Sequence, residues 1–165
     1  MILNVDMYEE TLTIFLKSLN KCRLVIGSYP EFIYNASDGG GEAELFQTDQ
    51  VDIKYLKFKP ETFSIPSLNW KTTRFLNLPL PPGLRIDMSM EKLEGTINTD
   101  SGEIRLIFES KFKFKLGYIF SFPNLLVKTY LQTGRIKSNL HEEEGLILQN
   151  NGRTNLVGVA LIPKT

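Results

Sequence analysis

The sequence predicts an all-β fold of mostly antiparallel strands, either a barrel or a sandwich with a C-terminal meander. The first of three observations behind this prediction is a period-two pattern in residues 103–116. One side of the pattern holds Ile104, Leu106, Phe108, Ser110, Phe112, Phe114 and Leu116, and the other side is charged apart from Ile107. Because successive side chains of a strand point to opposite faces, this segment is a long strand with one buried and one solvated face. Such strands are typical of antiparallel sheets.

The second observation is a matching partner strand in residues 83–97. Residues 99–102 (Thr-Asp-Ser-Gly) have the composition of a hairpin turn. Apolar residues occupy even positions up to Met90 but odd positions from Leu93, so one extra residue near Glu91 is needed, and a β-bulge supplies one. Pairing outward from the turn then predicts four opposite pairs: Leu93 with Phe108, Met88 with Phe112, Ile86 with Phe114 and Asp87 with Lys113.

The third observation is a series of shorter strand candidates separated by turns. These strands are predicted at 23–26, 42–48, 51–59, 124–133, 146–149 and 153–162. Residues 37–41 (Ser-Asp-Gly-Gly-Gly) and 150–152 (Asn-Asn-Gly) are predicted turns. Residues 60–83 contain five of the eight prolines and are predicted to be a long irregular connection. Residues 5–19 fit either a helical face or a strand, and we prefer the strand.

The alternative fold is an α+β helix-grip architecture, which needs a long amphipathic helix packed across the sheet. The chain instead ends in a predicted strand that Pro163 closes, which favours the all-β prediction. The chain has 165 residues and contains neither a linker nor a convincing repeat. We therefore predict a single β-rich domain over residues 1–165.

Charge and cysteine content limit the classes of partner and compartment. Lys plus Arg and Asp plus Glu number 19 each, so the chain is neutral. This balance argues against nucleic acid or an anionic membrane as the principal partner, although a local patch can survive the averaging. The lysines at 54, 57, 59, 111, 113 and 115 are diluted by interleaved acids. A single cysteine, no signal peptide and no apolar run of membrane-spanning length predict a cytoplasmic protein without integral membrane association.

Residues with catalytic or metal-binding chemistry are few. His141 stands before three glutamates, but no further ligands follow at metal-site spacing, so this run is interpreted as a solvated loop. Cys22 has no recognisable base beside it and is interpreted as a structural thiol. Residues 39–41 lack the Lys and Ser/Thr of a phosphate-binding loop. We therefore predict no catalysis, no metal and no cofactor.

Two binding functions from different classes remain. The first is carriage of an apolar or amphipathic small molecule, such as a lipid or pigment, inside a β-barrel. Ser110 is a small polar gap in a bulky row, and apolar side chains in predicted loops could line a pocket mouth. The predicted ligand-binding residues are Ser110, Phe112, Trp70, Phe75, Tyr118 and Phe120.

The second function is protein–protein interaction through an outer sheet face or the proline-rich loop at residues 78–83. Ile107 and the apolar residues 118–120 would be its contact points. The bulky inward row favours a filled interior, with Ser110 as the exception, and we place the small-molecule carrier first. The oligomeric state is open.

Five segments resemble a family of uncharacterised proteins that cyanobacteria share with the plastids of algae and plants. They are residues 80–85 (LPPGLR), 92–96 (KLEGT), 101–103 (SGE), 125–129 (LLVKT) and 153–160 (RTNLVGVA). The resemblance covers roughly the C-terminal half of the chain. It implies a cyanobacterial cytoplasmic or thylakoid-adjacent setting and brings no activity or catalytic residues.

Overall fold

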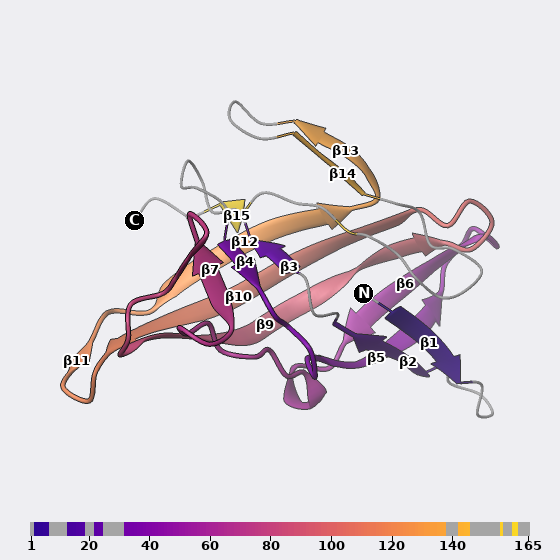
Figure 1. Ribbon diagram of the computed structural model, residues 1–165. Helices are drawn as coiled ribbons and strands as arrows, with labels where there is room; N and C mark the ends of the chain where they lie inside the picture. Colours follow the sequence, from indigo (N-terminus) through magenta and orange to yellow (C-terminus); the bar gives the residue numbers. More distant parts are fainter. Residues whose placement is uncertain are drawn as a thin grey trace.

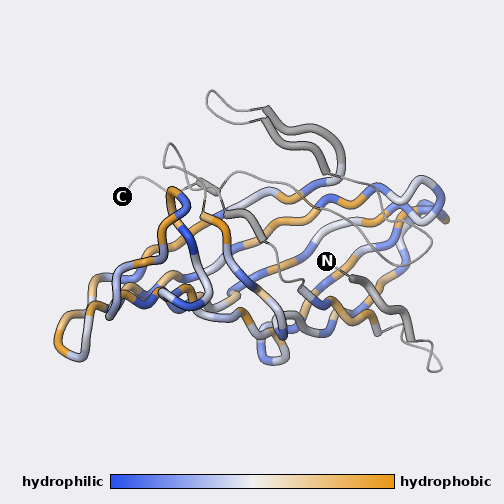
Figure 2. The backbone as a smooth tube through the Cα atoms, in the orientation of Figure 1, coloured by the Kyte–Doolittle hydropathy of each residue, from blue (hydrophilic) through white to orange (hydrophobic). Residues whose placement is uncertain are grey.

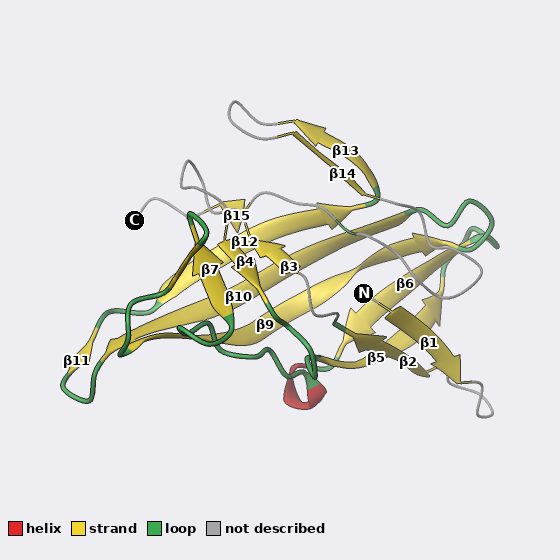
Figure 3. Ribbon diagram, in the orientation of Figure 1, coloured by secondary structure: helices red, strands yellow, loops and turns green. Residues whose placement is uncertain are grey.

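A computed structural model describes residues 2–6, 13–18, 22–24, 32–137, 142–145, 156 and 160–161 of the chain. Almost every element in these residues is an antiparallel strand, and the one helical element among them is the single 3-10 turn η1 (Pro60–Thr62) (Figures 1 and 3). The fold is all-β and sandwich-like, as the sequence predicts. The long helix of the alternative helix-grip fold is not present in the described part of the chain.

The large sheet forms the body of the molecule. Its strand order is β1 (Ile2–Asp6), β2 (Thr13–Lys17), β5 (Gly40–Gln47), β6 (Ile53–Phe58), β9 (Leu84–Asn98), β10 (Ile104–Leu116), β12 (Leu125–Gln132) and β15 (Ala160–Leu161). The short β11 (Phe120–Ser121) pairs with the end of β10. Since β1 and β15 stand at the two ends of this order, the described strands form an open sheet and not a closed barrel.

A second sheet lies over one half of the large one. It contains β3 (Cys22–Leu24), β4 (Phe32–Tyr34), β7 (Thr73–Phe75) and β8 (Leu78–Pro79) and crosses β9, β10 and β12 (Figure 1). The rings of Phe32 and Phe75 stack at 4.6 Å and pack against buried residues of the large sheet. A separate hairpin pairs β13 (Gly134–Lys137) with β14 (Glu142–Gly145).

The long β9–β10 hairpin has the register that the sequence predicts. Leu93 pairs with Phe108 and Met88 with Phe112, and the other two predicted pairs are also present. Lys92 stands opposite Glu109 and Met90 opposite Ser110, so Glu91 is the additional residue of a bulge. The bulge lets both strands present their apolar side chains to the same face.

Two clusters of buried apolar side chains form the interior. The first lies towards the β9–β10 turn and contains Ile14, Leu16, Ala43, Leu56, Phe58, Met90, Leu93, Ile97, Ile104 and Leu106. The second lies beneath the second sheet and contains Leu68, Leu80, Ile86, Phe112 and Val127. Figure 2 shows the corresponding alternation of hydrophobic and hydrophilic positions along the long strands.

The predicted irregular connection at 60–83 is more ordered than we expect from its prolines. It contains β7 and β8, and two backbone bridges tie it to the large sheet, Ser64 to Gly40 and Leu68 to Ile86. These are pairings with distant segments, which local composition does not encode. The segment is therefore bridged to the large sheet at β5 and at β9.

Two loop predictions need correction for a similar reason. Ser37 and Asp38 form a turn as predicted, but Gly40 and Gly41 begin β5 and pair with β2. A Cβ atom on Gly40 would lie 1.8 Å from the carbonyl oxygen of Leu16, so a close approach of two strands requires glycine there. The glutamates after His141 were expected in a solvated loop, but Glu142–Gly145 is a strand.

Several predictions fall on parts of the chain outside the described residues. The described parts of 5–19 are strands, in agreement with the preferred interpretation. The predicted strand at 146–149, the turn at 150–152 and most of the strand at 153–162 lie outside the described residues.

We expect Phe112→Ala to lower the free energy of unfolding by about 3–5 kcal/mol, because the ring is 2% exposed in the second cluster. Phe114→Ala should cost less, since that ring is only partly buried against the same cluster. Urea denaturation at neutral pH measures both, with the exposed Val51→Ala as a control near zero. A larger loss for Phe114→Ala than for Phe112→Ala would contradict this assignment of the core.

Candidate functional site

The six predicted ligand-binding residues do not meet around one cavity. Ser110 and Phe112 are buried in the middle of β10, and Phe75 is partly buried in the second sheet. Trp70, Tyr118 and Phe120 are exposed. The last two lie at the far end of the long hairpin, while Trp70 lies in the connection before β7.

Ser110 occupies the polar gap that the sequence indicates. Its cross-strand neighbours are Met90 and Val127, which belong to the first and second cluster respectively. The side chain is 0% exposed, and its Oγ has no hydrogen-bond partner among the described residues. A buried hydroxyl without a partner costs about 1–3 kcal/mol.

Two shallow depressions open on the surface of the described part of the chain. One, of about 180 Å³, is lined by residues 33–35 and 70–74, with the Lys71 ammonium 5.3 Å from the centre of the Trp70 ring. The other, of about 260 Å³, is lined by Ile53, Thr96, Asn98, Glu103 and Arg105. Neither is lined by Ser110, and both are smaller than the roughly 300 Å³ at which small-molecule pockets begin.

The most unusual surface lies at the end of the β9–β10 hairpin that is opposite its turn. We call this surface the hairpin tip and define it as residues 116–122. Leu116 pairs with Phe120 across a three-residue turn, and the fully exposed Tyr118 and Ile119 form its apex. Phe122 is also exposed. Figure 1 shows this end of the hairpin, labelled β11, projecting beyond the second sheet, and Figure 2 shows that it is hydrophobic.

The tip contains no charged side chain that would favour its exposure to solvent. From residue 116 to residue 127 there is no Asp, Glu, Lys or Arg. Contiguous exposed apolar side chains of this kind mark a site of interaction in monomeric proteins. The tip is therefore the best candidate for the functional site.

Backbone hydrogen bonds fix the shape of the tip. The N–H of Gly117 donates to the carbonyl oxygen of Gly83 at 2.9 Å, and the N–H of Phe122 donates to that of Phe114 at 3.1 Å. Gly83 and Gly117 have φ values of 88° and 61°, which glycine adopts without strain. The proline-rich loop before β9 is thereby held against the tip.

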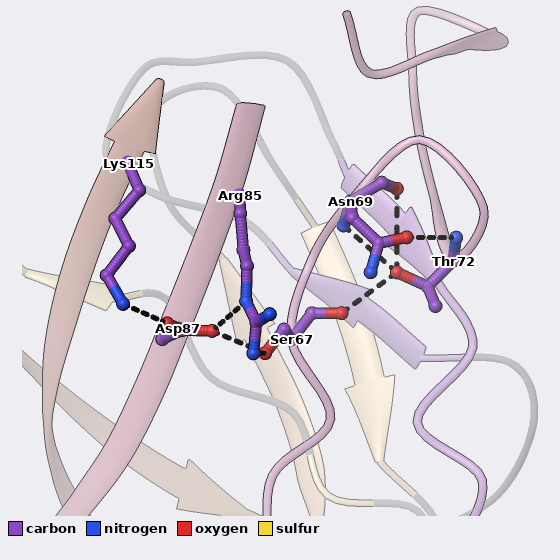
Figure 4. Close-up of polar contacts among 6 residues, drawn as sticks. All are labelled: Ser67, Asn69, Thr72, Arg85, Asp87 and Lys115. Carbon is purple, nitrogen blue, oxygen red and sulfur yellow. Dashed lines mark hydrogen bonds and ion pairs between the residues drawn. The ribbon is translucent and has the colours of Figure 1, made fainter. Parts of the chain in front are cut away.

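A polar network beside the tip centres on the carboxylate of Asp87 (Figure 4). Arg85 Nε donates to Asp87 Oδ1 at 2.6 Å, Ser67 Oγ donates to the same oxygen at 2.5 Å, and Lys115 Nζ lies 3.2 Å from Oδ2. Burial by itself raises the pKa of Asp87, but these three partners outweigh it and lower the pKa from 3.8 to about 2. The network therefore joins both strands of the hairpin to the loop that carries Ser67.

That loop is itself closed by local hydrogen bonds. The Asn69 side chain accepts hydrogen bonds from the N–H groups of Lys71 and Thr72, and the Thr72 hydroxyl donates to the carbonyl oxygen of Ser67 at 2.9 Å. Leu68 and Ile86 exchange two backbone hydrogen bonds of 2.9 Å. The base of the tip is thus supported on both sides of β9.

Neither a metal-binding cluster nor a membrane-spanning helix is present among the described residues. They contain no group of three or more His, Cys, Asp or Glu side chains that could hold a metal ion. No helix among them has the length and apolar character needed to cross a bilayer. His141 and the side chain of Cys22 lie outside the described part of the chain.

Comparison with known proteins brings no relative: no family model, curated protein or solved structure matches the chain.

We expect Asp87→Asn to destabilise the protein at pH 7 by about 1 kcal/mol, after allowance for the partial exposure of the carboxylate. A lowered carboxyl pKa stabilises the fold above the unfolded value of 3.8, and this contribution is lost as the pH falls towards about 2. The Asp87→Asn protein should therefore lose less stability than the wild-type protein as the pH falls from 3.8 to about 2. Urea denaturation across this range measures the effect.

The matched control is Asp100→Asn in the exposed turn between β9 and β10. It should leave both the stability at pH 7 and its acid dependence close to those of the wild type. An Asp87→Asn protein whose unfolding free energy falls with acid as steeply as that of the wild type would show that the network does not stabilise the fold.

Proposed function

We propose that this protein is a docking module that attaches to a partner surface through its apolar hairpin tip. The observation that carries the proposal is the set of exposed apolar side chains at the end of the longest hairpin: Leu116, Tyr118, Ile119, Phe120 and Phe122. Burying such side chains in a complex is favourable by roughly 25 cal/mol for each Å² removed from water.

The support beneath the tip favours binding without a large entropic cost. The tip ends a hairpin whose strands are 15 and 13 residues long, and the Asp87 network braces it at its base. A surface that is already held in its bound shape loses little conformational freedom on association.

The proline-rich loop at residues 78–83 belongs to the same end of the molecule. Leu80 is buried in the second cluster and anchors the loop, whereas Pro81 and Pro82 are exposed. Leu84, which follows the loop, pairs with Leu116 at the base of the tip. Of the contact points that the sequence suggests, residues 118–120 and this loop therefore form one surface, while Ile107 is half-buried and lies further along β10.

A second candidate is the small-molecule carrier that the sequence ranks first. One observation favours it, the buried hydroxyl of Ser110 without a partner between the two clusters. Native mass spectrometry of protein purified from its own host tests it, because a carried ligand would appear as a fixed mass increment. Ser110→Ala should abolish this increment, and a protein without any increment would count against the carrier.

Docking through the tip is tested by photo-crosslinking in the cells that make the protein. A benzoylphenylalanine introduced at position 119 should give a defined adduct after irradiation, because the apex is buried in the complex. The same group at position 51 is the matched control, since Val51 is equally exposed in the turn between β5 and β6. Equal labelling at the two positions would contradict the proposed function.

A further inference from the structure

The chemistry of the tip fits the boundary of a lipid bilayer. Three of its exposed side chains are aromatic (Tyr118, Phe120 and Phe122), two are aliphatic, and Ser121 is polar. Tyrosine combines an apolar ring with a polar hydroxyl and is enriched where a membrane meets water. The polar atoms of the tip backbone are partly satisfied by the β10–β11 pairing.

The length of the tip fits the depth of that boundary. The apex stands two to three residues beyond Leu116 on one strand and one to two residues beyond its partner Phe120 on the other. At roughly 3.3 Å for each strand residue, the apolar section is about 7–10 Å deep. Interfacial segments bury their apolar face to about 5–10 Å.

Basic side chains follow directly behind the apolar section. Lys111, Lys113 and Lys115 alternate on the exposed face of β10, and Arg85 lies opposite Lys115. These four cations exceed the two acids paired with them, Asp87 and Glu91, by two charges. No ion pair of Lys113 is present among the described residues. If the apex enters a bilayer, this band lies at the level of the lipid headgroups.

The opposite end of the molecule carries an excess of two acids, because four acids in and beside its turns outnumber the two cations there, Lys54 and Arg105. The turn between β5 and β6 contains Asp49 and Asp52, and the turn between β9 and β10 contains Asp100 and is followed by Glu103. The two turns touch, because the N–H of Thr99 donates to the carbonyl oxygen of Asp52 at 2.7 Å. The neutral chain is thus polarised along the hairpin, with cations behind the tip and acids at the far end.

We infer that the surface bound by the hairpin tip is that of a bilayer rich in anionic lipid, with the acidic end pointing away from it. This inference rests on the proposed docking function and names its partner. The apolar apex enters the headgroup region, the lysine band contacts lipid phosphates, and the acidic turns are kept at the greatest distance from the negative surface.

Flotation with vesicles tests the inference on the 165-residue chain. The protein should bind vesicles of equimolar phosphatidylcholine and phosphatidylglycerol more tightly than vesicles of phosphatidylcholine alone, and added salt should weaken binding. Lys111→Gln with Lys113→Gln should weaken binding about 25-fold, at about fivefold for each charge. The matched pair Lys17→Gln with Lys57→Gln removes two exposed lysines away from the tip and should leave binding unchanged.

Insertion of the apex has its own readout. In a Trp70→Phe background, Ile119→Trp provides a single fluorophore that should shift to shorter wavelength on vesicles and be quenched by brominated lipid. Tyr118→Ser with Ile119→Ser should weaken binding tenfold or more, whereas Val51→Ser should not, and circular dichroism confirms that each variant is folded.

The outcomes separate the inference from the function on which it rests. The lipid inference is overturned if the protein binds neither kind of vesicle while position 119 crosslinks to a polypeptide. That outcome leaves the docking function intact. Equal affinity for the two kinds of vesicle overturns the role of the lysine band. Equal crosslinking at positions 119 and 51 overturns the docking function itself.

Discussion

The register of the β9–β10 hairpin is the constraint on which the rest of the structure depends. A slip of one residue would move every apolar side chain of a strand to the opposite face. The bulge at Glu91 prevents this by absorbing the parity change between Met90 and Leu93, so both clusters receive side chains from both strands. β6 and β12 then pair with the outer edges of the hairpin, and the tip is simply its distal end.

The division of the interior explains why the hairpin is left with a free end. The first cluster is enclosed by β2, β5 and β6 near the β9–β10 turn, and the second by the second sheet. Neither β2, β5 and β6 nor the second sheet extends over the last residues of β10. Leu116 and the turn beyond it therefore have no apolar layer above them in the described part of the chain. Ser110 lies where the two clusters meet, which accounts for its burial without a hydrogen-bonding partner.

Much of the hairpin could be predicted from sequence because its evidence is local, in the parity of apolar positions and the composition of one turn. The pairings that were missed join distant segments: Ser64 bridges Gly40, and Ser67 bonds to Asp87, 20 residues away. At the candidate site the sequence identifies Tyr118 and Phe120 as loop residues but cannot distinguish side chains that cap a core from those that remain in water. The resemblance to cyanobacterial and plastid proteins stays a prediction.

Net charge was the least informative of the sequence observations, and the fold gives the reason. An antiparallel hairpin places its turn at one end and its two strand termini at the other, so residues close in sequence can lie at opposite ends of the molecule. Asp100 and Lys115 are 15 positions apart, yet almost the whole length of β10 separates them. A total of zero therefore conceals an acidic end and a basic end. Because screening limits electrostatic attraction to about 8–10 Å, a partner responds to the end that it meets and not to the sum.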